Sequence, residues 1–547
     1  MNQNSPEEPT AQLNPTGLPE TDEQSEKNLA LWEERLRLEA KAKNPTGAYW
    51  IPFSAWLITL LLGLMLANAR PYFHDEAATW YYSGFSMLQL FDKLSGDVHP
   101  PLYFLTSWLL LLSNDLFTLR VFSVLCGSLT VAIISVRAVQ SLPQSRAWML
   151  SFLLCTSPFL IFLFHFARYY SFVCLLVTGT ALAVERYIKS QRRFDCFMVG
   201  LMCSLLFLTN YAVALLIAVP TLIILVGWNL WKQESLNLVL ALVPTWVTVL
   251  AWMPFLLSQF GDGFDGRTTT AAGDFLRGFV LNGGYMVFSF GASDALPPWT
   301  IGGLTVAALN LIAFGWGFII CLRHSGKTRL MCVAVLAMLI ASAVIGAVIM
   351  KSAGFIFFPA RVGWVYLLWF AVAVGIPLAI NKAPQGLLVI CGVCNGIGMV
   401  ALLGTSTTTV WAYQVPNQEI AAYVTQLKNQ SPNATVLVNM KSLGNIAYEL
   451  EKQTPAINQG PCPPQGDIIL VGEASAPAWP PYDAVRNEDN CNPFIPYVQT
   501  EEQFFLSENN ATVRAKQRFL KRDVLKEKLV VRKFSFNPQI KTTPTTP

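Results

Sequence analysis

Charged residues are scarce in this chain of 547 residues, because Asp, Glu, Lys and Arg together make up only 13% of it. A typical soluble domain carries about 25% charged residues. Histidine is rarer still, with four residues, whereas hydrophobic residues reach 53%. This composition excludes an ordinary soluble enzyme. The net charge of +4 is spread over loops, so no basic face for nucleic acid is predicted.

Motifs of the common soluble enzyme classes are also missing. The sequence has no Walker A, HExxH or GxSxG motif, which argues against a P-loop protein, a zincin or an α/β-hydrolase. The Gly261–Arg267 loop lacks the ligand spacing of a calcium loop. No metal site or other cofactor is therefore predicted, and a divalent metal is the less favoured alternative. The N-terminal residues lack a basic start and an early apolar core, so we expect no cleavable signal peptide.

Cysteine is concentrated in the apolar part of the chain, where a free thiol behaves as a small apolar side chain. Nine of the 11 cysteines lie there, and for the pair Cys391 and Cys394 helix packing is favoured over redox chemistry. Only Cys462 and Cys491 lie nearer the C-terminus. A disulfide between these two fits an oxidising compartment, and two free thiols are the alternative.

Apolar runs of about 20 residues recur from Ile51 to Gly404, and each is long enough to cross a bilayer. The run at 101–113 is shorter and suits a re-entrant or interfacial segment. The chain is therefore predicted to be an α-helical polytopic membrane protein with about eleven transmembrane helices. The expected spans are 51–69, 119–139, 147–165, 169–188, 196–210, 211–230, 237–257, 301–321, 330–350, 356–380 and 387–408.

The loops give this topology a direction. Basic residues gather in loops on one side of the predicted spans, and the positive-inside tendency makes that side cytoplasmic. We expect an integral plasma (inner) membrane protein whose first outer loop, residues 70–100, lies on the extracytoplasmic side. ATP and sugar nucleotides are absent there, so an enzyme would need a donor carried in the membrane.

Composition divides the chain into three parts. Residues 1–48 are predicted to be a polar cytoplasmic tail, 49–408 the membrane domain, and 409–547 a small extracytoplasmic α/β domain. The helices and strands expected in the last part are helices at 420–427 and 442–452 and strands at 434–440, 467–472 and 524–536.

A polar island follows the first apolar run. It begins with His74, Asp75 and Glu76 and continues with Asp97 and His99, which two prolines follow. Ionisable groups at a membrane face are costly and usually mark a functional site. A carboxylate can accept the proton of an attacking hydroxyl, so Asp75 and Glu76 are the candidate catalytic residues. The alternative is a solvated acidic loop.

Three arginines are candidates for holding a phosphate. Arg168 follows His165 and opens an outer-side span together with Tyr169. Its planar fork of donors suits a phosphate, and anchoring at the membrane interface is the alternative. Arg120 and Arg361 raise the same question, and Arg361 lies within an apolar run where an unpaired charge is costly.

The residues of the first half resemble those of the GT-C superfamily of membrane glycosyltransferases, especially the protein O-mannosyltransferase-like family 39. The segment Asp97-Val98-His99-Pro100-Pro101-Leu102 is close to the DVHPPL element of protein mannosyltransferases. Three further matches are His74-Asp75-Glu76, the stretch Thr118–Gly127 and Ala167-Arg168-Tyr169-Tyr170. The resemblance covers residues 50–260 and extends to the later spans only in layout.

This resemblance implies an inverting transfer of a sugar from a polyprenyl-phosphate donor to a lipid, glycan or protein hydroxyl. Asp75 would be the general base, and Glu76 would orient it or the acceptor. His99, Arg168 and Arg361 would neutralise the departing phosphate. The further site candidates are His74, Asp97, Arg120, His165 and Tyr169.

The sequence also departs from the family. Tyr103 and Phe104 stand where protein mannosyltransferases have Gly-Lys, and the 258–300 loop is too short for their β-trefoil insert. A lipid or glycan of a bacterial cell envelope is therefore at least as well supported an acceptor as a protein. A transporter or flippase of a lipid-linked substrate is the main alternative function, although the internal symmetry it predicts is not visible. A catalytically dead scaffold for the outer domain is a third.

Overall fold

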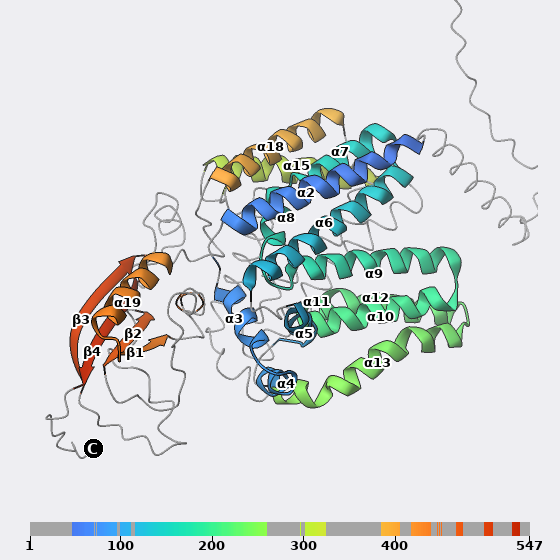
Figure 1. Cartoon of the computed structure of the whole chain (residues 1–547). Coiled ribbons are helices and arrows are strands. Elements are labelled where there is room, and N and C mark those ends of the chain that lie inside the picture. The colour runs from blue at the N-terminus through green and yellow to red at the C-terminus, as the bar shows by residue number, and fades with distance from the viewer. Residues whose placement is uncertain are drawn as a thin grey trace, which may run out of the picture.

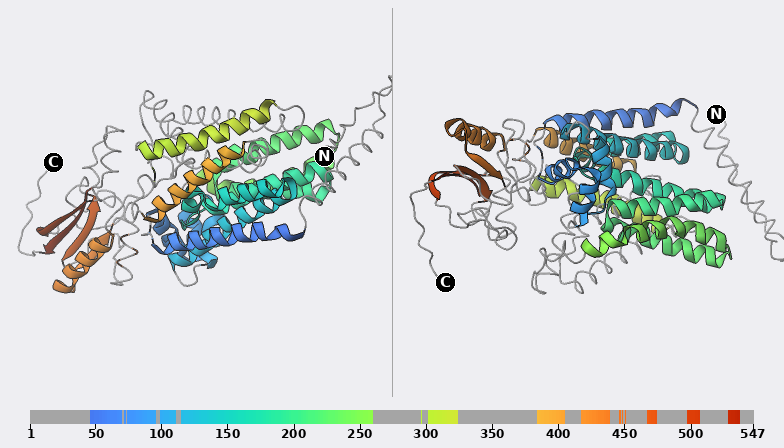
Figure 2. Two further views of the ribbon diagram at one scale, coloured as in Figure 1. Left: turned by 90° about the horizontal axis from the view of Figure 1, so that it is seen from above. Right: turned by 60° about the horizontal axis from the view of Figure 1, so that its bottom comes forward.

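The computed structural model describes residues 46–69, 72, 74–95, 99–110, 115–259, 296, 301–323, 384–404, 417–438, 446, 448, 450, 467–473, 497–506 and 528–536. This part of the chain forms a bundle of helices and a smaller unit of one helix and four strands (Figure 1). In all three views the smaller unit lies beyond one end of the bundle (Figure 1 and Figure 2). It therefore adjoins the helix ends rather than the long sides of the helices.

The chain enters the bundle through one long helix and then forms three short ones. The short helix α5 has nine residues, about 14 Å of helix, which is less than a bilayer requires. The long helix α6 begins where the Asp115 carboxylate accepts hydrogen bonds from the N–H groups of Phe117 and Thr118. The elements are η1 (Thr46–Tyr49), α2 (Trp50–Ala69), α3 (His74–Ser83), α4 (Met87–Ser95), α5 (Leu102–Leu110) and α6 (Leu116–Ser141).

The next helices contain two interruptions. The axes of α7 and α8 differ by 52°, and α8 starts with Pro158 behind the capping hydroxyl of Ser157. A π-helical turn, η2, interrupts the span that follows Asn210. The elements are α7 (Gln144–Cys155), α8 (Pro158–Phe164), α9 (Tyr170–Ser190), α10 (Arg193–Thr209), α11 (Tyr211–Val213), η2 (Ala214–Ala218), α12 (Val219–Trp231), α13 (Ser235–Ser258), α15 (Ile301–Arg323) and α18 (Gln385–Gly404).

In the described ranges, six helices are long and apolar enough to cross a membrane, or seven if the bent pair α7 and α8 counts as one span. The prediction of a polytopic helical membrane protein is confirmed. The expected continuous span at 147–165 was wrong in one respect, because the chain breaks and turns at Ser157 and Pro158. The expected spans 330–350 and 356–380 lie outside the described residues, so the total of about eleven stays a prediction.

Basic side chains lie at the end of the bundle opposite the polar island. Arg137, near the C-terminal end of α6, pairs with Glu185 of α9, which also pairs with Lys189. Arg186 of α9 pairs with Asp195 at the start of α10, 2.7 Å apart. The basic residues that end α6 and α9 therefore lie at the same end of the bundle, as the sequence predicts. The compartment that this end faces stays a prediction.

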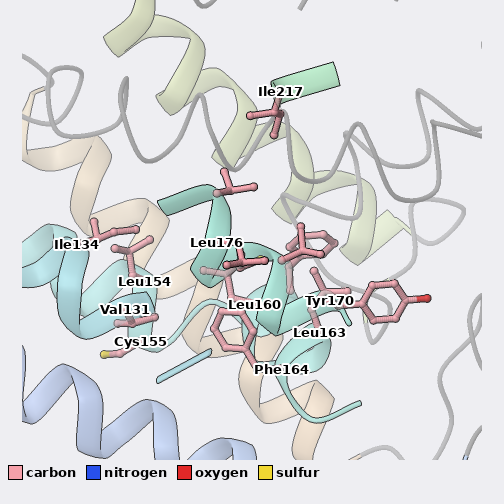
Figure 3. Close-up of a cluster of buried hydrophobic side chains, with 14 of the residues drawn as sticks. Val131, Ile134, Leu154, Cys155, Leu160, Leu163, Phe164, Tyr170, Leu176 and Ile217 are labelled. Atoms are coloured by element: carbon pink, nitrogen blue, oxygen red, sulfur yellow. The ribbon is translucent and has the colours of Figure 1, made fainter. Parts of the chain in front are cut away.

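The core of the bundle is apolar and closely packed. Val131 and Ile134 of α6 lie beside Leu154 and Cys155 of α7, and Leu160 of α8 belongs to the same cluster (Figure 3). A Cβ on Gly127 would lie 2.2 Å from the Phe164 ring, so this glycine lets α8 approach α6. The close approach brings the turn between α8 and α9 next to the first turns of α6.

Free thiols are buried in this core. Cys391 and Cys394 of α18 are both free and buried, which supports the packing interpretation. Cys462 and Cys491 lie outside the described residues, so their disulfide stays a prediction.

The smaller unit is an α/β layer. Its helix α19 (Asn417–Gln430) covers a four-stranded sheet of order β1-β2-β4-β3. The pair β1 and β2 is parallel and the other two pairs are antiparallel. The strands are β1 (Thr435–Val438), β2 (Ile468–Glu473), β3 (Tyr497–Leu506) and β4 (Lys528–Phe536), and the buried side chains between α19 and the sheet include Ile420, Val424, Leu427, Val436, Ile469, Val471 and Val531.

Strand β3 was not predicted. Its sequence carries two adjacent glutamates, which are rare in strands, and its register is interrupted between Gln499 and Glu501. The glutamates are accommodated because Glu502 pairs with Arg532 and Glu501 with Lys533 on the neighbouring strand. Cross-strand charge pairs of this kind are not visible in the sequence of either strand alone.

Candidate active site

The polar island folds against one end of the bundle, on the side of the smaller unit (Figure 1). Helix α3 carries Glu76 and Thr79, two prolines separate His99 from the start of α5, and Arg120 lies in the second turn of α6. The turn between α8 and α9 supplies Arg168. Segments up to about 90 residues apart therefore meet at one place, since Ala167 and Glu76 are hydrogen bonded at a separation of 91 residues.

A buried ion pair forms the centre of this site. Glu76 and Arg120 have 0% exposed side chains, and the guanidinium donates from Nε to Oε1 at 2.8 Å and from Nη2 to Oε2 at 2.6 Å. Two parallel bonds of this type are the strongest geometry for an arginine and a carboxylate. A lone charge at this depth would be very costly, so each residue depends on the other.

Backbone groups complete the pair. The N–H of Ala167 donates to Glu76 Oε1 at 2.7 Å, and Arg120 Nη1 donates to the carbonyl of Ala67 at 2.7 Å. The Tyr72 ring lies 4.2 Å from the Arg120 guanidinium carbon, in a cation–π contact. The pair thus connects the ends of α2 and α6, helix α3 and the turn between α8 and α9.

A second arginine lies beside the pair and in contact with a histidine. Arg168 is 4% exposed, and its Nη2 lies 3.5 Å from Nε2 of His99. Its Nη1 donates to the hydroxyl of Thr79 at 3.3 Å. The guanidinium carbon of Arg168 also lies 5.3 Å from the ring of Tyr169. Two groups that can bind an anion, Arg168 and half-buried His99, therefore lie in contact.

His99 is held by a residue that the sequence did not indicate. The side chain of Gln259, at the end of α13, is fully buried and donates to the carbonyls of Leu94 at 2.7 Å and His99 at 3.2 Å. Its Oε1 accepts from the hydroxyl of Tyr211 at 2.7 Å, and Tyr211 accepts from the indole N–H of Trp252. A glutamine at the end of an apolar run has no periodic signal that would point to this function.

Buried aromatic side chains surround the site. Burial raises the pKa of the Tyr103 phenol, so the phenol stays protonated at neutral pH. His165 is 1% exposed, and its Nδ1 lies in hydrogen-bonding distance of the Phe162 carbonyl. Tyr169 packs its ring 6.1 Å from the rings of both His99 and Tyr103.

Comparison with solved structures identifies the fold. The chain matches the crystal structure of ArnT from Cupriavidus metallidurans bound to undecaprenyl phosphate, with a TM-score of 0.50 and 13% sequence identity over 89% of this chain and 98% of that one. ArnT is a GT-C glycosyltransferase. The chain has a GT-C type fold. The apo structure of the same ArnT matches with a TM-score of 0.36 and 11% identity over 87% and 97% of the two chains. No family model and no curated protein matches the sequence.

The GT-C type fold brings together most, but not all, of the predicted site residues. Glu76, Arg120, Arg168 and His99 lie in one network, and Tyr169 borders it. His165 lies three residues before Arg168, in the turn between α8 and α9. For His74 and Asp75, the structure gives only their backbone in the first turn of α3, directly before Glu76. Asp97 and Arg361 lie outside the described residues. Among the residues that the structure describes, no group of three or more His, Cys, Asp or Glu side chains could hold a metal ion.

Replacing Gln259 is expected to destabilise the protein, because the backbone carbonyls of Leu94 and His99 lose the hydrogen bonds that Gln259 donates. The variant Gln259→Leu keeps a side chain of similar size but removes both donated hydrogen bonds, which leaves buried carbonyls unpaired. We expect the free energy of unfolding to fall by about 1–3 kcal/mol. Thermal unfolding in detergent measures this effect. The control Gln140→Leu, at an exposed position of α6, should change stability by less than about 0.5 kcal/mol. Equal effects of the two variants would contradict the role given to Gln259.

Proposed function

We propose that the protein transfers a sugar from a polyprenyl-phosphate-linked donor to a hydroxyl of a lipid, glycan or protein acceptor, with inversion at the anomeric carbon. The observation that carries this proposal is the contact of Arg168 with His99 beside the buried Glu76–Arg120 pair, in a chain with a GT-C type fold. That the matching ArnT binds undecaprenyl phosphate supports a lipid of this class as the ligand.

The proposed reaction assigns one role to each group. Asp75 accepts the proton of the acceptor hydroxyl as its oxygen attacks the anomeric carbon. The bond from that carbon to the phosphate oxygen breaks, and the electron pair leaves with the polyprenyl phosphate. Arg168 and His99 stabilise the charge that develops on this leaving group, because fixed donors in a dry site act strongly on it. Arg361, which the structure does not describe, is proposed as a further phosphate ligand.

Glu76 is proposed to orient rather than to accept a proton. Its two carboxylate oxygens accept hydrogen bonds from Arg120 and Ala167, and its side chain is fully buried. These bonds fix the first turn of α3, in which Asp75 precedes it. The extracytoplasmic position of the site, in the plasma (inner) membrane, is part of the same proposal, because a lipid-linked donor requires no nucleotide at that face.

Replacing Asp75 tests the proposal. We expect Asp75→Asn to lower sugar transfer by about 100-fold or more, since a general base typically contributes that much. The measurement uses proteoliposomes and radiolabelled undecaprenyl-phosphate hexoses, aminosugars and pentoses, with product formation as the readout. Thermal unfolding of each variant shows whether the fold is retained.

The matched control is Asp92→Asn, at an exposed position of α4, which should transfer at the wild-type rate. Transfer that survives in Asp75→Asn would remove Asp75 from the mechanism. Passage of the lipid-linked sugar across the bilayer unchanged, equally in all three proteins, would favour the transporter instead.

A further inference from the structure

The C-terminal unit contacts the helix bundle through the side chain of Tyr448. Tyr448 is 3% exposed and packs in a cluster with Leu116 and Leu119 of α6 and with Ala167. Partly buried Tyr72 and Trp80 close this cluster. Tyr448 comes from a helical segment between β1 and β2, so a residue of the C-terminal unit borders the candidate site.

The residues on either side of Tyr448 belong to the other core. Ile446 and Leu450 are fully buried in the cluster between α19 and the sheet. Positions four residues apart share a face of a helix, and the position between them points to the opposite side. Ile446 and Leu450 therefore pack within the C-terminal unit, whereas Tyr448 packs against the helix bundle.

The neighbours of Tyr448 are also neighbours of the buried ion pair. The ring of Tyr448 meets Tyr72 edge to face, with centroids 5.0 Å apart, and Tyr72 carries the Arg120 guanidinium on its ring. It meets Trp80 in the same way at 5.2 Å, and Trp80 lies one helical turn after Glu76 on α3. The third neighbour, Ala167, donates its N–H to Glu76.

We propose that Tyr448 is a positioning residue through which the C-terminal unit holds the Glu76–Arg120 pair, the first turn of α3 and the Ala167–Arg168 turn in place. Ala167 and Tyr72, which both contact the ion pair, then pack against the same aromatic ring. The effect on catalysis rests on the proposed function, whereas the mechanical coupling does not. A ligand that shifts the C-terminal unit would move the site through this ring.

Hydrogen exchange of the Ala167 amide tests the coupling without any activity assay. We expect Tyr448→Leu, which keeps apolar bulk but removes both ring contacts, to speed exchange at Ala167 at least tenfold. Amides of β2 and β4 should exchange as in the wild type. Tyr448→Phe keeps both ring contacts and should restore protection at Ala167.

The control is Tyr423→Leu, which removes the contact of α19 with Phe505 within the C-terminal unit. It should leave the Ala167 amide protected. Unchanged exchange at Ala167 in Tyr448→Leu, or an equal rise in Tyr423→Leu, would overturn the proposal. If Tyr448→Leu fails to fold, a Trp80→Leu variant with Tyr448 intact removes one of the two ring contacts and leaves the ring of Tyr72 on Arg120; it must speed exchange at Ala167.

Kinetics separates this inference from the proposed function. If the wild-type protein transfers sugar, Tyr448→Leu should lower kcat about tenfold with little change in KM for the donor, and Tyr448→Phe should restore kcat. If the wild-type protein transfers no sugar while Ala167 exchange responds as expected, the proposed function fails and the coupling stands.

Discussion

Arg120→Leu is expected to lower the free energy of unfolding by about 3–5 kcal/mol, the cost of leaving a buried charge without its partner. Arg120 is among the largest fully buried side chains of the described residues, and the hydrogen bonds it donates include two to Glu76 and one to the Ala67 carbonyl. Removing it leaves the Glu76 carboxylate fully buried without the charge of Arg120 beside it. Thermal unfolding in detergent, followed by tryptophan fluorescence, measures the loss.

A double variant tests whether the charge is the cause. Replacing both members of a buried pair by apolar residues is often close to neutral, so Glu76→Leu with Arg120→Leu should recover part of the stability. The recovery should be incomplete, because the Ala167 N–H and the Ala67 carbonyl lose their partners at about 1–3 kcal/mol each. A double variant less stable than Arg120→Leu alone would show that shape, not charge, dominates.

An exposed pair provides the control for Arg120. Lys189 is 61% exposed and pairs with Glu185 at 2.9 Å, one helical turn away. Such pairs contribute about 0.3–0.5 kcal/mol, so Lys189→Leu should be almost neutral. If Arg120→Leu proved as mild as Lys189→Leu, the ion pair would not be the centre that holds the site together.

The sequence singled out candidate site residues, but it did not indicate which of them would pair. Asp75, Glu76, His99 and Arg168 stood out because ionisable groups are rare beside apolar runs. The pairing of Glu76 with Arg120 could not be read from the chain, because it depends on how α3 packs across α2 and α6. The sequence shows where a buried charge would be unfavourable, and only the fold shows which partner stabilises it.

The sequence predicted the long helices of the bundle, but it missed the bend between α7 and α8 and the strand β3. Long apolar runs mark α2, α6, α9 and α13, because a helix can span a bilayer when it is both long enough and predominantly apolar. The bend before Pro158 was missed, since an apolar run on both sides conceals it. Strand β3 was missed because its glutamates are matched only by charges on another strand.

Gly200→Leu is expected to lower the free energy of unfolding by more than about 3 kcal/mol, beyond the usual cost of inserting a single methylene into a core. Helices α10 and α13 touch at this glycine: a Cβ there would lie 2.1 Å from the Ala241 carbonyl oxygen. A backbone atom cannot rotate aside as a flexible side chain can. The two helices must therefore separate along their contact, where the Thr245 hydroxyl also donates to the Gly200 carbonyl.

The separation should also reach the site. Helix α13 ends at the Gln259 network, and α10 leads into Tyr211, whose hydroxyl donates to Gln259. Forcing the helices apart would pull these partners away from the His99 backbone, so Gly200→Leu should expose amides around Leu94 and His99 to hydrogen exchange. This links a packing contact in the middle of the bundle to the geometry of the proposed phosphate site.

Gly227→Leu is the matched control, because Gly227 is exposed on α12 and a Cβ there meets nothing within 4 Å. Leucine favours a helix over glycine by about 0.8–1 kcal/mol, so this variant should be neutral or slightly stabilised. If Gly200→Leu destabilises the protein and Gly227→Leu does not, the loss of stability comes from the steric clash with Ala241 and not from the helix propensity of leucine. Equal, mild effects at both positions would mean that α10 and α13 do not touch at Gly200 and that His99 is positioned without this contact.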